Sequence, residues 1–264
     1  MLRNHMRLLS LYLYPVKSAR GLALSEGVVG ERGLEGDRRF MVIDEAGLFL
    51  TQRTLSRMAL LQVTLSAERL RLFGPGVDLD LPRHPSGGER RRVTVWRDQV
   101  DAWSLGPQPE LSAFLERRVE LVYMPDETVR PVDLDWAPPG KKVGFADGFP
   151  FLLTTTASLA ELARRGADVE MIRFRPNLVI DGTEPFAEDG WRALRIGAVR
   201  FLVCKPCARC TIPNVDPLTG EVGVEPTRTL IGFRKFDGKV RFGQNLVAED
   251  RGLIRVGDEV VIEA

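Results

Sequence analysis

Short apolar segments rich in aromatic and β-branched residues recur along this 264-residue chain, and Gly and Pro residues punctuate them. The first segment, 7–14, partly alternates apolar and polar residues and stops at Pro15, as a strand with one buried face does. Further strand-like segments lie at 60–65, 70–73, 93–96, 119–123, 178–180, 194–203, 240–242 and 259–262. This pattern predicts a mainly β fold with a few helices.

Turn formers and helical spacing place the remaining elements. Segments 40–43 and 48–51 flank the turn-forming stretch 44–47, which predicts a hairpin. Segment 74–92 is dense in Pro, Gly and charge, so we expect turns and loop there. Leu111 and Phe114 have helical spacing within 109–117.

A second helix is expected at about 156–165. Leu159 and Leu162 would face inward, Thr155 or Thr156 is available as the N-cap, and Gly166 would stop the helix. The stretch 125–140 carries four prolines and several carboxylates with little apolar periodicity, as a linker or surface loop does. We therefore predict two domains, 1–125 and 126–264.

The overall charge is close to neutral. The 37 basic and 36 acidic residues give a net charge of +1, so we expect no nucleic acid partner, and any anion site must be local. The sequence contains neither a secretory apolar segment nor a stretch approaching the roughly 20 apolar residues of a membrane span. We therefore expect a cytoplasmic protein without a membrane partner.

All three cysteines, Cys204, Cys207 and Cys210, fall within seven residues. This spacing allows joint ligation of zinc or an iron-sulfur cluster, but the fourth ligand is missing, since His5 and His84 are distant in sequence. For Cys204 we expect the role of a small apolar residue at the end of a strand.

Cys210 has a different setting from that of Cys204. Arg209 precedes it and Lys205 lies nearby, and adjacent cations favour the thiolate that serves as nucleophile or soft-metal ligand.

Three further segments combine cations with polar groups that can hold an anion. Lys17 and Ser18 follow the first strand, and Arg38 precedes the next one. In the third segment, Arg175 and Asn177 flank a proline that stiffens the turn. Together these segments predict a phosphate-binding site.

Seven motifs occur in an order that resembles a known family. They are Tyr14-Pro-Val-Lys-Ser18, Gly36-Asp-Arg38, Phe174-Arg-Pro-Asn177, Phe186-Ala-Glu-Asp-Gly-Trp191, Cys207-Ala-Arg-Cys210, Val215-Asp-Pro-Leu-Thr-Gly220 and Phe242-Gly-Gln244. The chain resembles the MOSC proteins that carry an N-terminal MOSC β-barrel domain, within them the group of the mitochondrial amidoxime-reducing component and its bacterial relatives. The resemblance implies an N-terminal β-barrel-like domain and a C-terminal MOSC β-barrel domain with a cofactor in the cleft between them.

The cofactor implied by the resemblance is the molybdenum cofactor, Mo-molybdopterin, with Cys210 as the protein's ligand to the metal. The positions that match the family's cofactor-binding residues are Lys17, Ser18, Arg38, Gly148, Phe149, Arg175, Asn177, Ala208, Arg209 and Cys210. Gly148, Phe149 and Ala208 depart from the hydroxyl residues of close relatives, so only their main chain can contact the phosphate.

The implied activity is reduction of N-hydroxylated compounds, such as amidoximes, hydroxylamines and N-hydroxylated base analogues, to amines. The chain ends without an iron-sulfur domain, so a separate electron donor is expected: a flavin reductase, a ferredoxin-like protein or a b-type cytochrome. Asp216 could position substrate or shuttle protons, or it could simply initiate a turn. Two alternatives stay open: a carrier of molybdenum cofactor or of sulfur as a persulfide on Cys207 or Cys210, and a metal-binding module that uses all three cysteines.

Overall fold

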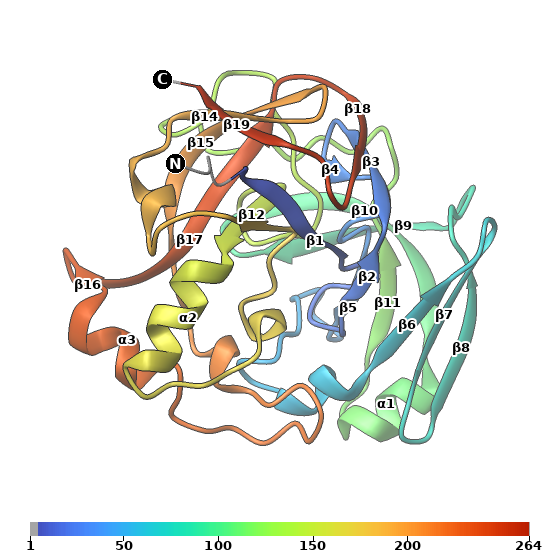
Figure 1. The fold of residues 1–264 in the computed structure, drawn as a ribbon. Helices are drawn as coiled ribbons and strands as arrows, with labels where there is room; N and C mark the ends of the chain where they lie inside the picture. Colours follow the sequence, from blue (N-terminus) through green and yellow to red (C-terminus); the bar gives the residue numbers. More distant parts are fainter. Residues whose placement is uncertain (1–4, 264) are drawn as a thin grey trace.

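The largest sheet has nine strands, and both ends of the chain contribute to it (Figure 1). Its order is β19-β14-β15-β17-β12-β13-β1-β2, with β16 paired to β17, and within it only β12 and β13 run parallel. Its strands are β1 (Arg7–Leu13), β2 (Leu22–Leu24), β12 (Phe151–Thr155), β13 (Leu178–Asp181), β14 (Ala193–Ile196), β15 (Val199–Ala208), β16 (Lys235–Phe236), β17 (Lys239–Ala248) and β19 (Val260–Glu263). Because β1 pairs with β13, the beginning of the chain is built into the sheet of its second half.

Three smaller sheets complete the β structure of residues 5–263, the part of the chain that this computed structural model describes. One contains β5 (Phe40–Ile43), β11 (Glu120–Tyr123), β10 (Asp98–Pro107) and β9 (Glu89–Val95) in that order. The second contains β18 (Gly252–Arg255), β3 (Glu26–Gly30) and β4 (Gly33–Leu34) in that order. The third contains β6 (Gln62–Leu65), β7 (Arg69–Gly74) and β8 (Val77–Pro82). The mainly β prediction is confirmed, with open rather than closed sheets. The boundary near 125 stays a prediction.

Helices are short and lie outside the sheets. They are α1 (Pro109–Leu115), α2 (Thr156–Arg164), α3 (Thr227–Phe233) and the 3-10 turns η1 (Ser56–Leu60), η2 (Met171–Phe174), η3 (Ala187–Gly190) and η4 (Ile212–Asn214). The two predicted helices are confirmed. Thr155 caps α2 by accepting a hydrogen bond from the Ser158 N–H at 3.2 Å, and Gly166 follows its end with a φ of +108°.

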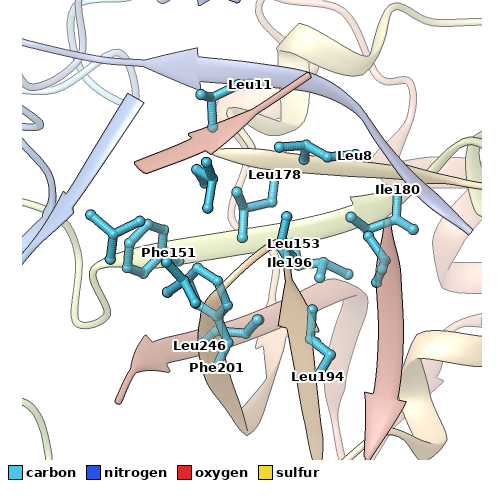
Figure 2. Packing of buried hydrophobic residues seen from close by; sticks show 14 of the residues in the cluster. Leu8, Leu11, Phe151, Leu153, Leu178, Ile180, Leu194, Ile196, Phe201 and Leu246 are labelled. Atoms are coloured by element: carbon cyan, nitrogen blue, oxygen red, sulfur yellow. The ribbon is translucent and has the colours of Figure 1, made fainter. Parts of the chain in front are cut away.

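The main hydrophobic core packs against the nine-stranded sheet (Figure 2). Phe151 of β12 and Phe201 of β15 meet edge to face, with ring centroids 5.2 Å apart. Leu8 and Leu11 of β1 belong to the same fully buried cluster. Burying side chains of this size stabilises the fold by about 1.5–3 kcal/mol each, so this core ties both halves of the chain together.

The expectation of loop over 74–92 is wrong, because β8 and the start of β9 lie there. Asp78 and Asp80 of β8 pair with Arg71 and Arg69 of β7 at 2.6 and 2.8 Å. The charges that suggested a loop thus form cross-strand pairs on a solvated face.

Two other predicted elements also differ in detail. Segment 194–203 is not one strand, since the turn at Gly197, with a φ of +54°, separates β14 from β15. In the predicted hairpin, 48–51 pairs with β5 through an isolated bridge from Phe49 to Ile43 rather than as a full strand.

Candidate functional site

A cavity of about 280 Å³ is lined by segments from both halves of the chain. Its wall contains all ten residues predicted to bind a cofactor, namely Lys17, Ser18, Arg38, Gly148, Phe149, Arg175, Asn177, Ala208, Arg209 and Cys210. Cys207, Lys205 and Asp147 also line it. The structure therefore brings together residues that lie up to 193 positions apart in the sequence, from Lys17 to Cys210.

Lys17 is buried at one side of the cavity, where it is 4% exposed. Its Nζ lies 2.5 Å from an Asp147 carboxylate oxygen and donates to the Phe145 carbonyl at 2.7 Å. Desolvation lowers the pKa of Lys17 to about 8, although the Asp147 charge opposes this shift. Burial would raise the pKa of Asp147, but Lys17 outweighs it and holds that pKa well below its usual range. The pair is thus ionised at neutral pH.

Two arginines stack on one buried tyrosine. The guanidinium carbons of Arg38 and Arg175 lie 4.3 and 4.4 Å from the Tyr14 ring centroid. Arg38 also donates to Asp37 at 2.5 Å and to the Asn177 side-chain oxygen at 2.9 Å. Burial lowers the pKa of Arg175 to about 10, so the group remains charged at neutral pH. The stacking holds two like charges at the cavity, where an anion would neutralise them.

Three residues of the cavity wall adopt left-handed backbone. Ser18, Arg38 and Arg175 have φ values of +67°, +45° and +58°. For a side chain larger than Gly this region costs roughly 1–3 kcal/mol, and such strain collects at functional sites. The backbone strain at these three residues lowers the stability of the fold while it orients their side chains at the cavity.

The end of β15 and the residues after it, 205–210, also line the cavity. Arg209 donates to the Cys207 sulfur at 3.0 Å and to the Phe174 carbonyl at 2.9 Å. Its Nε is buried without a hydrogen-bond partner, and a buried donor of this kind calls for a ligand or water. Cys210 lines the cavity beside it.

Cys204 does not share this site. It packs against an apolar cluster that includes Val132, Val143 and Val247, and burial raises the pKa of its thiol. Its expected role as a small apolar residue is confirmed. Within residues 5–263, no group of three or more His, Cys, Asp or Glu side chains is arranged to hold a metal ion. The three cysteines are therefore not gathered as one ligand set.

Asp216 is not part of the cavity wall. One of its oxygens accepts the Leu218 N–H at 2.8 Å and the other pairs with Arg173 at 2.6 Å. The Leu218 N–H is the main group that lowers its pKa below the usual range. These contacts are those of a turn-initiating aspartate.

Sequence reasoning missed Arg130, which is 2% exposed. It donates to the carbonyls of Gly144, at 2.8 Å, and Ala146, and pairs with Asp98 at 2.7 Å. It thereby fixes segment 144–147, of which Ala146 and Asp147 line the cavity. An arginine between a valine and a proline in the apparent linker was the available signal.

The donor set suits a phosphate-bearing ligand that also offers a soft metal to a thiolate. Five cations line the cavity against the single carboxylate of Asp147; they are Lys17, Arg38, Arg175, Lys205 and Arg209. The unpartnered Arg209 Nε lies next to Cys210 in the sequence, so charge and thiol occupy the same wall. The residues present therefore fit a molybdenum cofactor.

The fold and this site define the class of protein. Residues 140–261 match the MOSC domain and residues 5–120 match the MOSC N-terminal beta barrel domain. The chain belongs to the family of MOSC proteins that carry this N-terminal domain.

Its relatives within that family carry two kinds of name. Over 274 residues it is 32% identical to "Mitochondrial amidoxime-reducing component 1" of Homo sapiens, covering 96% of this chain and 81% of that protein. The Mus musculus protein of the same name is 33% identical, with the same coverage of both chains. "Molybdenum cofactor sulfurase" of Solanum lycopersicum is 27% identical, and this chain spans only 35% of its length. These names support a function related to the molybdenum cofactor.

The described part of the chain, 5–263, includes no helix that is both long and apolar enough to cross a membrane.

Proposed function

We propose that the protein is a molybdenum-cofactor-dependent oxidoreductase that reduces N-hydroxylated compounds to amines. The observation that supports this most is the single cavity that combines Cys210 with all the other predicted cofactor residues. When bound, the cofactor supplies two-electron oxygen-transfer chemistry. Overall, two electrons and two protons convert each N–OH group to N–H and water.

The residues of this chain have separable roles in the proposal. Cys210 supplies a thiolate to the metal, and Arg209, its neighbour in the sequence, lines the same cavity. Arg38, Arg175 and Lys17 offer charge-assisted donors to the terminal phosphate, and Asn177 holds Arg38 in place at 2.9 Å. Gly148, Phe149 and Ala208 contribute only main-chain groups.

Electrons would come from a separate protein of the flavin reductase, ferredoxin-like or b-type cytochrome kind. For Asp216 we retain the role of turn initiator, because its carboxylate is already engaged by Arg173 and Leu218.

The test is Cys210→Ser, prepared in a host that synthesises molybdenum cofactor. We expect loss of all reduction of benzamidoxime with a reduced viologen dye as donor, and an unchanged fold by circular dichroism. Cys204→Ser is the matched control, since Cys204 packs in an apolar cluster and its variant should keep activity. Full activity of Cys210→Ser would refute the ligand assignment.

A second candidate function is the sulfur carrier. It is favoured by the presence of Cys207 in the same wall, at 3.0 Å from the Arg209 guanidinium. Intact-mass measurement of the purified protein tests it. An added sulfur atom on Cys207 or Cys210 without bound pterin would support the carrier, and bound pterin without added sulfur would support the reductase.

A further inference from the structure

Trp96 occupies a backbone position that a tryptophan ordinarily avoids. It is the first residue of the two-residue turn between β9 and β10, because Val95 pairs directly with Asp98. Its φ is +58°. Tight hairpin turns need positive φ at this position and normally place Gly or Asn there, since a bulky side chain is strained. Residues with strained backbone conformations of this kind are concentrated at functional sites.

The Trp96 side chain is nevertheless held firmly. The Arg53 guanidinium carbon lies 4.2 Å from its ring centroid, and the Phe49 ring packs against it with centroids 5.3 Å apart. Even so, Trp96 remains 44% exposed. The chain therefore fixes the indole on one side and leaves part of it open.

Three connections tie this indole to the cavity. Arg53 pairs with Asp147 of the cavity wall at 3.6 Å, and the Trp96 side chain helps to lower the pKa of the same carboxylate. Asp98, the residue that closes the turn, pairs with Arg130, which fixes segment 144–147 next to and within the cavity wall. Trp96 and Arg53 do not themselves line the cavity, but both lie next to Asp147, which does.

The neighbouring groups indicate what would bind there. Arg53 has a buried Nη2 without a hydrogen-bond partner, and a ligand with a hydrogen-bond acceptor beside Trp96 would supply that partner. The exposed part of the indole favours a flat conjugated ring, since aromatic side chains interact with such rings by stacking. A flat nitrogen heterocycle with an acceptor at its edge combines both requirements.

We propose that Trp96, supported by Arg53, is a stacking residue for a flat nitrogen heterocycle beside Asp147 of the cavity wall. The inference rests on the proposed reductase function, and two sources could supply the ring: the N-hydroxylated substrate or the pterin of the cofactor. The substrate source makes Trp96 a determinant of specificity for aromatic over aliphatic N-hydroxylated compounds. The pterin source makes it a cofactor-retention residue.

The experiment compares Trp96→Gly and Trp96→Leu with wild type. Trp96→Gly removes the indole and gives the turn the residue that it prefers, so stability is not expected to fall through strain. Two quantities are measured: the pterin content per protein, and the ratio of kcat/KM for N-hydroxycytosine to that for acetamidoxime. Phe236→Leu is the matched control, because Phe236 is also 44% exposed beside a hairpin turn, and its guanidinium partners Arg234 and Arg241 do not line the cavity.

Unchanged pterin with an approximately tenfold loss of preference for the aromatic substrate would assign the ring to the substrate. A fall in pterin content in both Trp96 variants, but not in Phe236→Leu, would assign it to the cofactor. Wild-type pterin content and wild-type selectivity in both variants would overturn the role of Trp96. A wild-type protein that binds pterin but reduces neither compound would contradict the reductase function instead, and the pterin content of the variants would then decide whether Trp96 stacks on the cofactor.

Discussion

The core of the nine-stranded sheet and the wall of the cavity differ in backbone conformation and in the charge of their side chains. Phe151 and Phe201 lie in extended strands and are almost fully buried, so backbone preference and burial favour the same structure. At the cavity, Ser18, Arg38 and Arg175 are in left-handed backbone and like charges stand close together. Packing in the core stabilises the fold, whereas the strained backbone and like charges of the cavity wall destabilise it. This contrast is expected when a binding site is already formed in the absence of its ligand.

Deleting a core ring should have the largest effect on stability. Phe201→Ala removes a fully buried side chain, so we expect a loss of about 3–5 kcal/mol in the free energy of unfolding, measured in urea. The exposed Phe236→Ala serves as the control and should change this free energy by less than about 1 kcal/mol. Equal effects of the two substitutions would contradict the account of the core.

Removing a stacked arginine should weaken the binding of the cofactor. Arg175→Ala loses a charged donor at the cavity, and we expect cofactor affinity to fall by about 1.5–3 kcal/mol, or roughly ten- to a hundredfold. The measurement is the pterin content per protein after dialysis. Arg175→Lys keeps the charge without the planar fork and should retain an intermediate amount. Full retention by Arg175→Ala would show that the phosphate site lies elsewhere.

The burial of Lys17 predicts a dependence of stability on pH. Its pKa is about 8 in the folded protein and 10.5 when exposed, so between these values the unfolded chain binds more protons. The free energy of unfolding of wild type should therefore rise relative to Lys17→Met between about pH 8 and 10.5, by roughly 1–3 kcal/mol. Between about pH 6 and 8 neither Lys17 nor Asp147 changes its charge, so the two curves should run parallel there. Parallel curves across the whole range would mean that Lys17 is not desolvated.

The smallest effect is expected at Gly148. An added Cβ there meets no atom within 4 Å, so Gly148→Ser should change stability by less than about 0.5 kcal/mol while adding a hydroxyl donor to the cavity. We expect pterin retention after dialysis to be equal or higher. Gly144→Ser is the contrasting variant, because its Cβ would lie 2.8 Å from the Arg38 carbonyl, and it should unfold more easily. Equal stability of the two variants would argue against this wall geometry.

Local sequence patterns predicted those elements that follow local rules. The cap at Thr155, the helix stop at Gly166 and the apolar role of Cys204 depend on neighbours in sequence or on simple burial, and all three were found. The charged strand β8 was missed because its aspartates resemble a loop until their arginine partners on β7 are known.

At the candidate site, contacts between segments far apart in the sequence could not be predicted from the sequence. The resemblance to MOSC proteins supplied the ten cofactor-binding candidates, and the cavity brings them together. The support from Arg130 and the position of Arg53 and Trp96 next to Asp147 were not predicted. Their contacts join segments far apart in the chain, and positive φ at Trp96 contradicts its local preference.

The most direct test of the central claim is elemental analysis for molybdenum together with pterin quantification, on wild type and Cys210→Ser from a host that makes the cofactor. If Cys210 binds the metal of a molybdenum cofactor, wild type contains near-equimolar molybdenum and pterin, and both are lost or sharply reduced in Cys210→Ser. Zinc or iron in place of molybdenum, or equal molybdenum in both proteins, would contradict this assignment.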